Sequence, residues 1–103
     1  MAAKLFLDDI RPCPDGYILV RNYTDCVTLL EHGIFDIVSL DYSLGSYQTG
    51  LTVLRWLAEH REHLPKKISI HSTHSYGISQ MRAFIKSHLS EVELIEPEFH
   101  RNY

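Results

Sequence analysis

Cysteine, long apolar runs and excess positive charge are scarce in this sequence, and each scarcity excludes a class of protein. The two cysteines, Cys13 and Cys26, are too few for a disulfide framework and form no Cys-x-x-Cys pair. The N-terminal apolar stretch is far too short for a signal peptide or a membrane span, so we expect a cytoplasmic protein without membrane contact. The net charge of −3, from 10 Lys and Arg against 13 Asp and Glu, argues against binding to duplex DNA.

The composition that is present is that of one globular domain. The chain has 103 residues, of which 45% are hydrophobic and 22% are charged. This length suits a single domain covering residues 1–103, with a core of its own and no separate substrate domain. Any functional site must therefore be built from loops on one compact scaffold.

Apolar runs and helical patterns alternate along the chain. Continuous apolar runs predict strands at residues 5–7 and 17–20, and short, largely apolar segments predict strands at 37–40 and 67–70. The alternating residues 92–95 predict an edge strand. Helical spacing predicts helices from Asn22 or Thr24, either of which can serve as the N-cap, to about Glu31, over residues 51–63, and over residues 78–89. This alternation predicts an α/β fold, with a parallel sheet covered by helices on both faces.

The link between the first two strands breaks this alternation. Residues 9–16 contain Pro12, Pro14 and Gly16, and they are too few for a crossover helix. Eight extended residues reach at most about 27 Å, which exceeds the roughly 17 Å of a five-residue strand. We therefore expect an extended, proline-rich loop in place of the first helix, followed by a parallel second strand. An antiparallel second strand is the alternative.

Acidic residues follow the predicted strands where ligands bind in open parallel sheets, at the carboxyl ends. Asp8 and Asp9 follow the first strand, and Asp41 follows the third. Converging carboxylates repel each other unless a cation lies between them, and oxygen ligands suit Mg²⁺ or another divalent cation such as Mn²⁺. The sequence thus predicts a metal site at Asp8, Asp9 and Asp41.

Other polar residues at this edge suit phosphate chemistry. Arg11 could bind a phosphate oxygen bidentately, and Ser72, after the fourth strand, could donate a hydrogen bond to another. His71 and His74 are candidates for the general acid or base, because imidazole titrates near neutral pH. With Asp41, these two histidines form the predicted catalytic set.

The chain resembles a response-regulator receiver domain over nearly its whole length. The resemblance rests on residues 35–41 (FDIVSLD), on the glycine-containing loop after them, and on residues 51–57 (LTVLRWL). It implies a flavodoxin-like sheet of order 2-1-3-4-5 and a phosphate-accepting Asp41. Receivers carry Lys-Pro after the fifth strand, whereas this chain has Glu96 and Pro97.

A closer resemblance is to the small proteins called cyclic-phosphate-processing receiver domains. It rests on residues 5–12 (LFLDDIRP), 39–45 (SLDYSLG), 49–50 (TG) and 70–72 (IHS), with Gly77 and Met81. It implies that the protein processes or senses cyclic phosphate groups, at RNA ends or in nucleotides. The family pattern has His-Asp where this chain has Tyr42 and Ser43, and often Asn in place of His74.

Three classes of function remain open on these residues. A metal-dependent cyclic phosphodiesterase would act on a phosphorylated small molecule or an RNA end. An atypical receiver would accept a phosphoryl group on Asp41. A non-catalytic receiver shell would bind a ligand or a protein partner, with Tyr42, Tyr47 and Tyr76 available to stack on a base.

Overall fold

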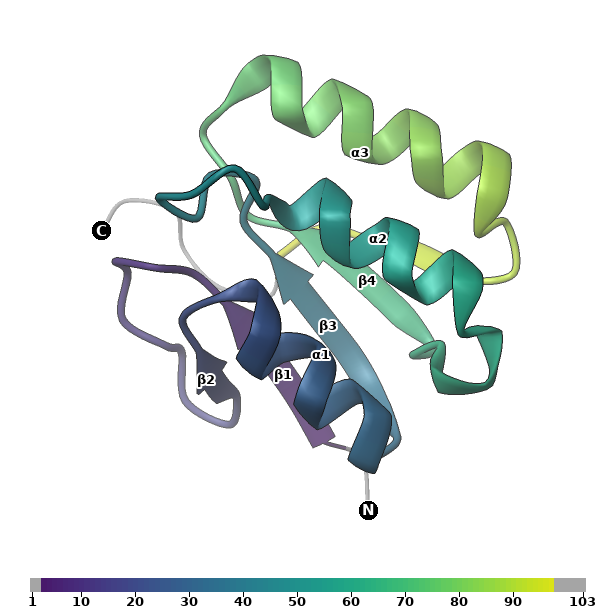
Figure 1. The fold of residues 1–103 in the computed structure, drawn as a ribbon, viewed down its shortest axis with the longest axis horizontal. Helices are drawn as coiled ribbons and strands as arrows, with labels where there is room; N and C mark the ends of the chain where they lie inside the picture. The colour runs from purple at the N-terminus through teal and green to yellow at the C-terminus, as the bar shows by residue number, and fades with distance from the viewer. Residues whose placement is uncertain (1–2, 98–103) are drawn as a thin grey trace.

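The computed structural model describes residues 3–97, which contain a five-stranded sheet with every neighbouring pair of strands parallel. The strand order is β2-β1-β3-β4-β5 (Figure 1). The strands are β1 (Ala3–Leu7), β2 (Ile18–Val20), β3 (Phe35–Leu40), β4 (Lys67–Ile70) and β5 (Glu93–Ile95). The predicted α/β class, the strand order and the edge position of the last strand are confirmed, and the second strand is parallel.

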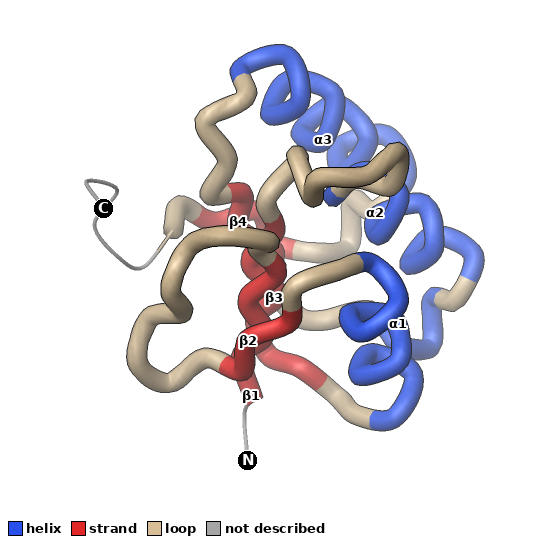
Figure 2. Tube along the Cα trace, turned by 60° about the vertical axis from the view of Figure 1, so that its left-hand side comes forward, coloured by secondary structure: helices blue, strands red, loops and turns tan. Residues whose placement is uncertain are grey.

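The α-helices of the described residues, α1 (Tyr23–His32), α2 (Gly50–Glu59) and α3 (Ser75–His88), all pack on one face of the sheet. Their apolar side chains form a single core with alternate strand residues, among them Leu5, Leu7, Val38, Leu40 and Ile68. Figure 2 shows the helices together on one side of the strands. The prediction of helices on both faces is therefore wrong for residues 3–97, because no helix follows β1.

The opposite face of the sheet is covered in part by the loop that replaces a helix after β1. Residues 8–17 contain no helix, as predicted, and Figure 2 shows this loop on the side away from the helices. The ring of Tyr17 meets the buried ring of Phe6 edge-on, with 6.1 Å between centroids. Side chains alternate along a strand, so Phe6 faces this loop while Leu5 and Leu7 face the helices.

Capping residues explain where α1 and α2 begin. Asn22 caps α1 by accepting a hydrogen bond from the N–H of Asp25, and Thr49 caps α2 in a capping box with Thr52. The predicted extension of the second helix to residue 63 is wrong, since α2 ends at Glu59 and a short 3₁₀ turn, η1 (Arg61–His63), follows. Helix α3 begins three residues before the predicted start, at Ser75.

No helix within residues 3–97 has the length and apolar character that a bilayer crossing requires. The longest of them, α3, has 14 residues, whereas a spanning helix needs about 20.

Gly50 links the start of α2 to the end of β3 by close packing. A Cβ atom at this position would lie 2.2 Å from the carbonyl oxygen of Asp41 and 2.7 Å from Cε of Met81. We expect Gly50→Ala to lower the free energy of unfolding by about 1–3 kcal/mol through overpacking. Urea unfolding measures this change. Gly33→Ala is the control, because its Cβ would have 3.4 Å to the Phe35 ring. Equal stability of the two variants would contradict the packing argument.

Candidate active site at the carboxyl edge of the sheet

Asp8, Asp41 and His71 lie in one row across the sheet, each directly after its strand. The backbone N–H of Asp41 donates to Leu7 and that of His71 donates to Leu40, at 3.1 and 3.0 Å, so the ladder of β1, β3 and β4 continues through this row. One ligand atom from each residue lies within 4.8 Å of the other two. The register of the sheet, rather than any sequence spacing, therefore brings these side chains together.

Three hydrogen-bond donors surround the Asp8 carboxylate, which is 1% exposed. Its Oδ1 accepts from the backbone N–H groups of Ile10 and Arg11, both at 2.9 Å, and its Oδ2 lies 3.1 Å from Nε2 of His71. Burial alone would raise the pKa of Asp8, but the two N–H donors and the neighbouring His71 outweigh it and lower this pKa. Asp8 is therefore ionised at neutral pH.

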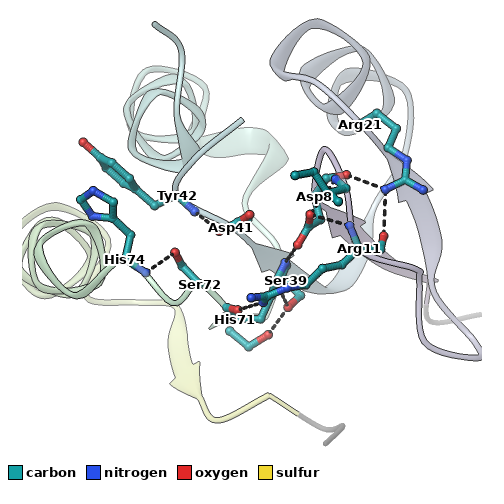
Figure 3. A network of polar contacts seen from close by, with 11 residues as sticks. Asp8, Arg11, Arg21, Ser39, Asp41, Tyr42, His71, Ser72 and His74 are labelled. Carbon is teal, nitrogen blue, oxygen red and sulfur yellow. Dashed lines mark hydrogen bonds and ion pairs between the residues drawn. The ribbon is translucent and has the colours of Figure 1, made fainter. Parts of the chain in front are cut away.

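His71 belongs to a buried chain of hydrogen bonds beneath the site (Figure 3). Ser69 donates its hydroxyl to Ser39, and Oγ of Ser39 lies 2.8 Å from Nδ1 of His71. Burial lowers the pKa of His71 to about 4, against the effect of Asp8. The neutral ring thus accepts from Ser39 at Nδ1 and donates from Nε2 to Asp8.

Ser39 and Ser69 are members of this network that the sequence analysis missed. They are directly paired between β3 and β4, and Ser39 pairs on its other side with Phe6 of β1. His71 stacks on the Phe6 ring, with 4.1 Å between centroids and 7° between planes. The available signal was a serine inside the apolar part of each strand, within residues 37–40 and 68–70.

The surroundings of Asp41 raise its pKa, whereas those of Asp8 lower the pKa of that group. Burial raises the pKa of Asp41, and the nearby Asp8 carboxylate raises it further. Hydrogen bonds from the Ser72 side chain and from the backbone N–H of Tyr42 oppose this rise. The negative charge of Asp41 is therefore only partly compensated by its neighbours, and a cation between the two carboxylates would compensate it further.

Arginines fix the loop after β1 over this edge. Arg11 donates from its guanidinium to the carbonyl of His71 at 2.9 Å. Arg21, which the sequence analysis did not single out, donates to the carbonyls of Asp8 and Arg11 at 3.2 and 2.8 Å. The loop that replaces a helix is therefore tied both to β4 and to the end of β2.

A pocket of about 510 Å³ opens above the row of Asp8 and Asp41. It is lined by residues 8–11, by residues 72–74, and by Asp41, Ser43 and Gly45. Six of the seven predicted site residues line it, and these are Asp8, Asp9, Arg11, Asp41, Ser72 and His74. His71 lies beneath the pocket instead, and the chemical roles predicted for all seven stay predictions.

His74 is held at the pocket rim by its own backbone and ring. Its backbone N–H donates to Ser72, and its Nδ1 accepts from the N–H of Gly77 at 2.9 Å, which caps α3. The ring nitrogen left for a ligand is therefore Nε2.

Asp9 and Glu96 lie outside the row of Asp8, Asp41 and His71. The side chain of Asp9 points away from that of Asp8, and its carboxylate lies toward Gly45. Glu96, in the place where receivers carry lysine, pairs with Arg82 of α3 at 3.6 Å.

The donor set fits a divalent cation. Asp8 offers a buried carboxylate oxygen and Asp41 a half-buried one, while both ring nitrogens of the adjacent His71 are engaged by Ser39 and Asp8. Hard cations such as Mg²⁺ prefer carboxylate oxygens and keep several waters, for which the adjoining pocket has room.

The buried histidine predicts a pH dependence of stability. His71 has a pKa of about 4 in the folded protein and about 6.5 when exposed. Between these two pH values the unfolded chain is protonated at His71 and the folded chain is not. Stability should therefore fall by about 3 kcal/mol between pH 7 and 4 from this group. The lowered pKa of Asp8 acts in the same direction on acidification, whereas the raised pKa of Asp41 opposes it.

Urea unfolding of wild type and His71→Gln across this pH range isolates the contribution of His71. Glutamine can still donate to Asp8 but does not titrate, so the variant should lose most of the slope. His88→Gln, at an exposed position in α3, is the control and should keep the wild-type slope. A His71→Gln profile parallel to that of wild type would disprove the assignment.

Comparison with known proteins agrees with this architecture. The family model described as the cyclic-phosphate processing receiver domain matches residues 3–87. A search of curated proteins finds no match to the sequence. The matched segment runs from the start of β1 into the last turn of α3, and so includes all residues that line the pocket. The chain belongs to the cyclic-phosphate processing receiver domain family.

Proposed function

We propose that this domain binds Mg²⁺ or Mn²⁺ at Asp8 and Asp41 and hydrolyses cyclic phosphate groups of nucleotides or RNA ends. The observation that carries the proposal is the pair of carboxylates beneath a pocket of about 510 Å³, with one oxygen from each within 4.8 Å of the other and of His71. Membership of the family directs the proposal to cyclic phosphates.

The phosphate would be held by Arg11 and Ser72 on opposite sides of the carboxylates. Arg11 uses one N–H on the carbonyl of His71, and a guanidinium has five N–H donors in all. Ser72 is buried at the pocket wall and shares a hydrogen bond with Asp41. The remaining N–H groups of Arg11 match the non-bridging oxygens of a phosphodiester, and the Ser72 hydroxyl would join them by turning from Asp41 once a cation binds that carboxylate.

Hydrolysis of a cyclic phosphodiester forms a bond between phosphorus and a water oxygen and breaks the bond to one sugar oxygen. The attacking water loses one proton and the leaving oxygen gains one, so the reaction balances. Because Nδ1 of His74 accepts from the N–H of Gly77, the ring proton is on Nε2, and His74 would donate a hydrogen bond from Nε2 to the leaving oxygen at the pocket rim. His71 has a positioning role, since its neutral ring holds Asp8 in place. A bound divalent cation would supply positive charge to the phosphate oxygens.

Cation binding should appear as a gain in thermal stability. At a concentration ten times its Kd, the cation should raise the free energy of unfolding by about 1.4 kcal/mol. In a domain of this size, that corresponds to a rise in Tm of roughly 5–10 °C. Asp41→Asn should raise Tm without metal, because it removes a half-buried charge beside Asp8, and should abolish the shift with metal. Asp15→Asn, an equal charge change at an exposed position, should keep the shift. Equal shifts in wild type and Asp41→Asn would rule out this cation site.

The enzymatic part of the proposal is tested by ³¹P NMR of the protein with Mg²⁺ and a 2′,3′-cyclic nucleotide. We expect conversion to a monophosphate, slowed at least 100-fold in Asp41→Asn and about 100- to 1000-fold in His74→Ala, the usual effect of removing one hydrogen-bond donor to a developing negative charge. Asp15→Asn should retain the wild-type rate. Turnover that survives in Asp41→Asn would remove the chemistry from this site.

The same samples separate the other two classes of function. Phosphorylation of Asp41 as in a signalling receiver predicts a mass gain of about 80 Da, one phosphoryl group, after treatment with acetyl phosphate and Mg²⁺. Glu96 disfavours this reading, because it places negative charge after β5 and pairs with Arg82.

Cation-dependent broadening of the nucleotide signal without turnover would indicate a sensor.

A further inference from the structure

A row of aromatic rings, defined here as Tyr42, His74 and Tyr76, adjoins the pocket on the side of α3. The Tyr42 and His74 rings lie 4.8 Å apart between centroids with a tilt of 31°, and Figure 3 shows them together beside Asp41 and Ser72. Tyr76 continues the row, with its ring 6.4 Å from that of His74 and nearly perpendicular to it at 69°. The row leads from the pocket to the first turn of α3.

The backbone ties this aromatic row to the polar groups of the pocket. The N–H of Tyr42 donates to Oδ1 of Asp41 at 2.8 Å, and the N–H of His74 donates to Oγ of Ser72 at 3.1 Å. Any movement of the rings as a body would therefore disturb the groups proposed to hold the cation and the phosphate.

Gly77 fixes the first two rings in place. Its N–H donates to Nδ1 of His74, and a Cβ atom on it would lie 2.2 Å from Cγ of Tyr42. The Tyr42 ring thus packs against bare backbone and supports one side of His74. Such rigid aromatic surfaces bind flat ligands without a large loss of side-chain entropy.

The exposed part of the row consists of His74 and Tyr76. Tyr76 is 64% exposed and offers the larger ring, whereas Tyr42 is half-buried. A ligand with its phosphate in the pocket and a flat ring one sugar away would pass His74 and reach the Tyr76 face. Nucleotides combine these two groups, and any base can stack because every base has a π face.

We propose that Tyr76, supported by His74, forms a base-stacking subsite, so that the ligand of this domain is a nucleoside cyclic phosphate or an RNA end rather than a base-free sugar phosphate. This inference rests on the proposed function insofar as it places the phosphate in the same pocket. It assigns Tyr76 a binding role that does not depend on catalysis.

The experiment compares adenosine 2′,3′-cyclic phosphate with glycerol 1,2-cyclic phosphate, which carries the same strained ring without a base. Both are titrated into the Mg²⁺-loaded protein, and ¹H and ³¹P NMR give each Kd. We expect the nucleotide to bind about 5- to 10-fold more tightly, near the lower end of the range for base stacking on aromatic side chains. The adenine protons should shift upfield through the ring current of tyrosine.

Substitutions assign the preference to Tyr76. Tyr76→Ala should make the two Kd values equal and remove the upfield shift, whereas Tyr76→Phe should keep both. Two controls address rival contacts, namely Tyr47→Ala, in a loop where Tyr47 is 92% exposed, and Ile10→Ser, on the other pocket rim where Ile10 is 79% exposed. Both controls should retain the preference.

Each other outcome overturns a defined part of the argument. Equal binding of the two ligands by wild type, or a preference that persists in Tyr76→Ala or disappears in either control, overturns the subsite even if hydrolysis is observed. A Tyr76-dependent preference without turnover supports the subsite and overturns the hydrolase. Absence of binding by both ligands overturns both proposals.

Discussion

Asp8 carries a carboxylate that is almost inaccessible to solvent, and its burial requires compensation by hydrogen bonds. Two backbone N–H groups of the following loop and the ring of His71 supply it. These donors come from the loop after β1 and from the residue after β4. The hydrogen bonds to Asp8 therefore hold both of these pocket walls in place. The Ser69–Ser39 pair extends this constraint into the sheet, since it determines which nitrogen of His71 carries the proton.

The absent helix and the site are physically connected. The chain after β1 crosses the helix-free face and turns directly over the sheet edge, which brings Arg11 to the carbonyl of His71 and to the pocket. Glu96, after β5, is paired with Arg82. Among the described residues, Arg11 is thus the arginine or lysine side chain that lines the pocket, and it lies in the loop after β1 rather than after β5.

Two carboxylates in one row work against folding stability and in favour of ligand binding. Asp8 is satisfied by donors, whereas the pKa of Asp41 is raised by burial and by Asp8 itself. Asp41 accepts hydrogen bonds from Ser72 and Tyr42, but these do not outweigh its burial and the neighbouring charge of Asp8. Carboxyl groups whose pKa is shifted in this way cluster at functional sites. The proposed cation site rests on this difference: the pKa of Asp8 is lowered by its donors, whereas the pKa of Asp41 is raised.

The sequence by itself determined the α/β class, the proline-rich link and six residues of the pocket wall, and its resemblance to receiver domains implied the strand order. The first three follow from local signals: apolar runs, prolines, and polar residues in the loops after the strands. Only the tertiary structure decided that all the described helices share one face, that His71 lies under the pocket, and that Ser39, Ser69 and Arg21 support the site. These features depend on register between strands distant in sequence, and on which way each side chain points once the strands pair. Asp8 and Asp9 differ by a single position, yet alternation gives one to the buried row and the other to the loop near Gly45.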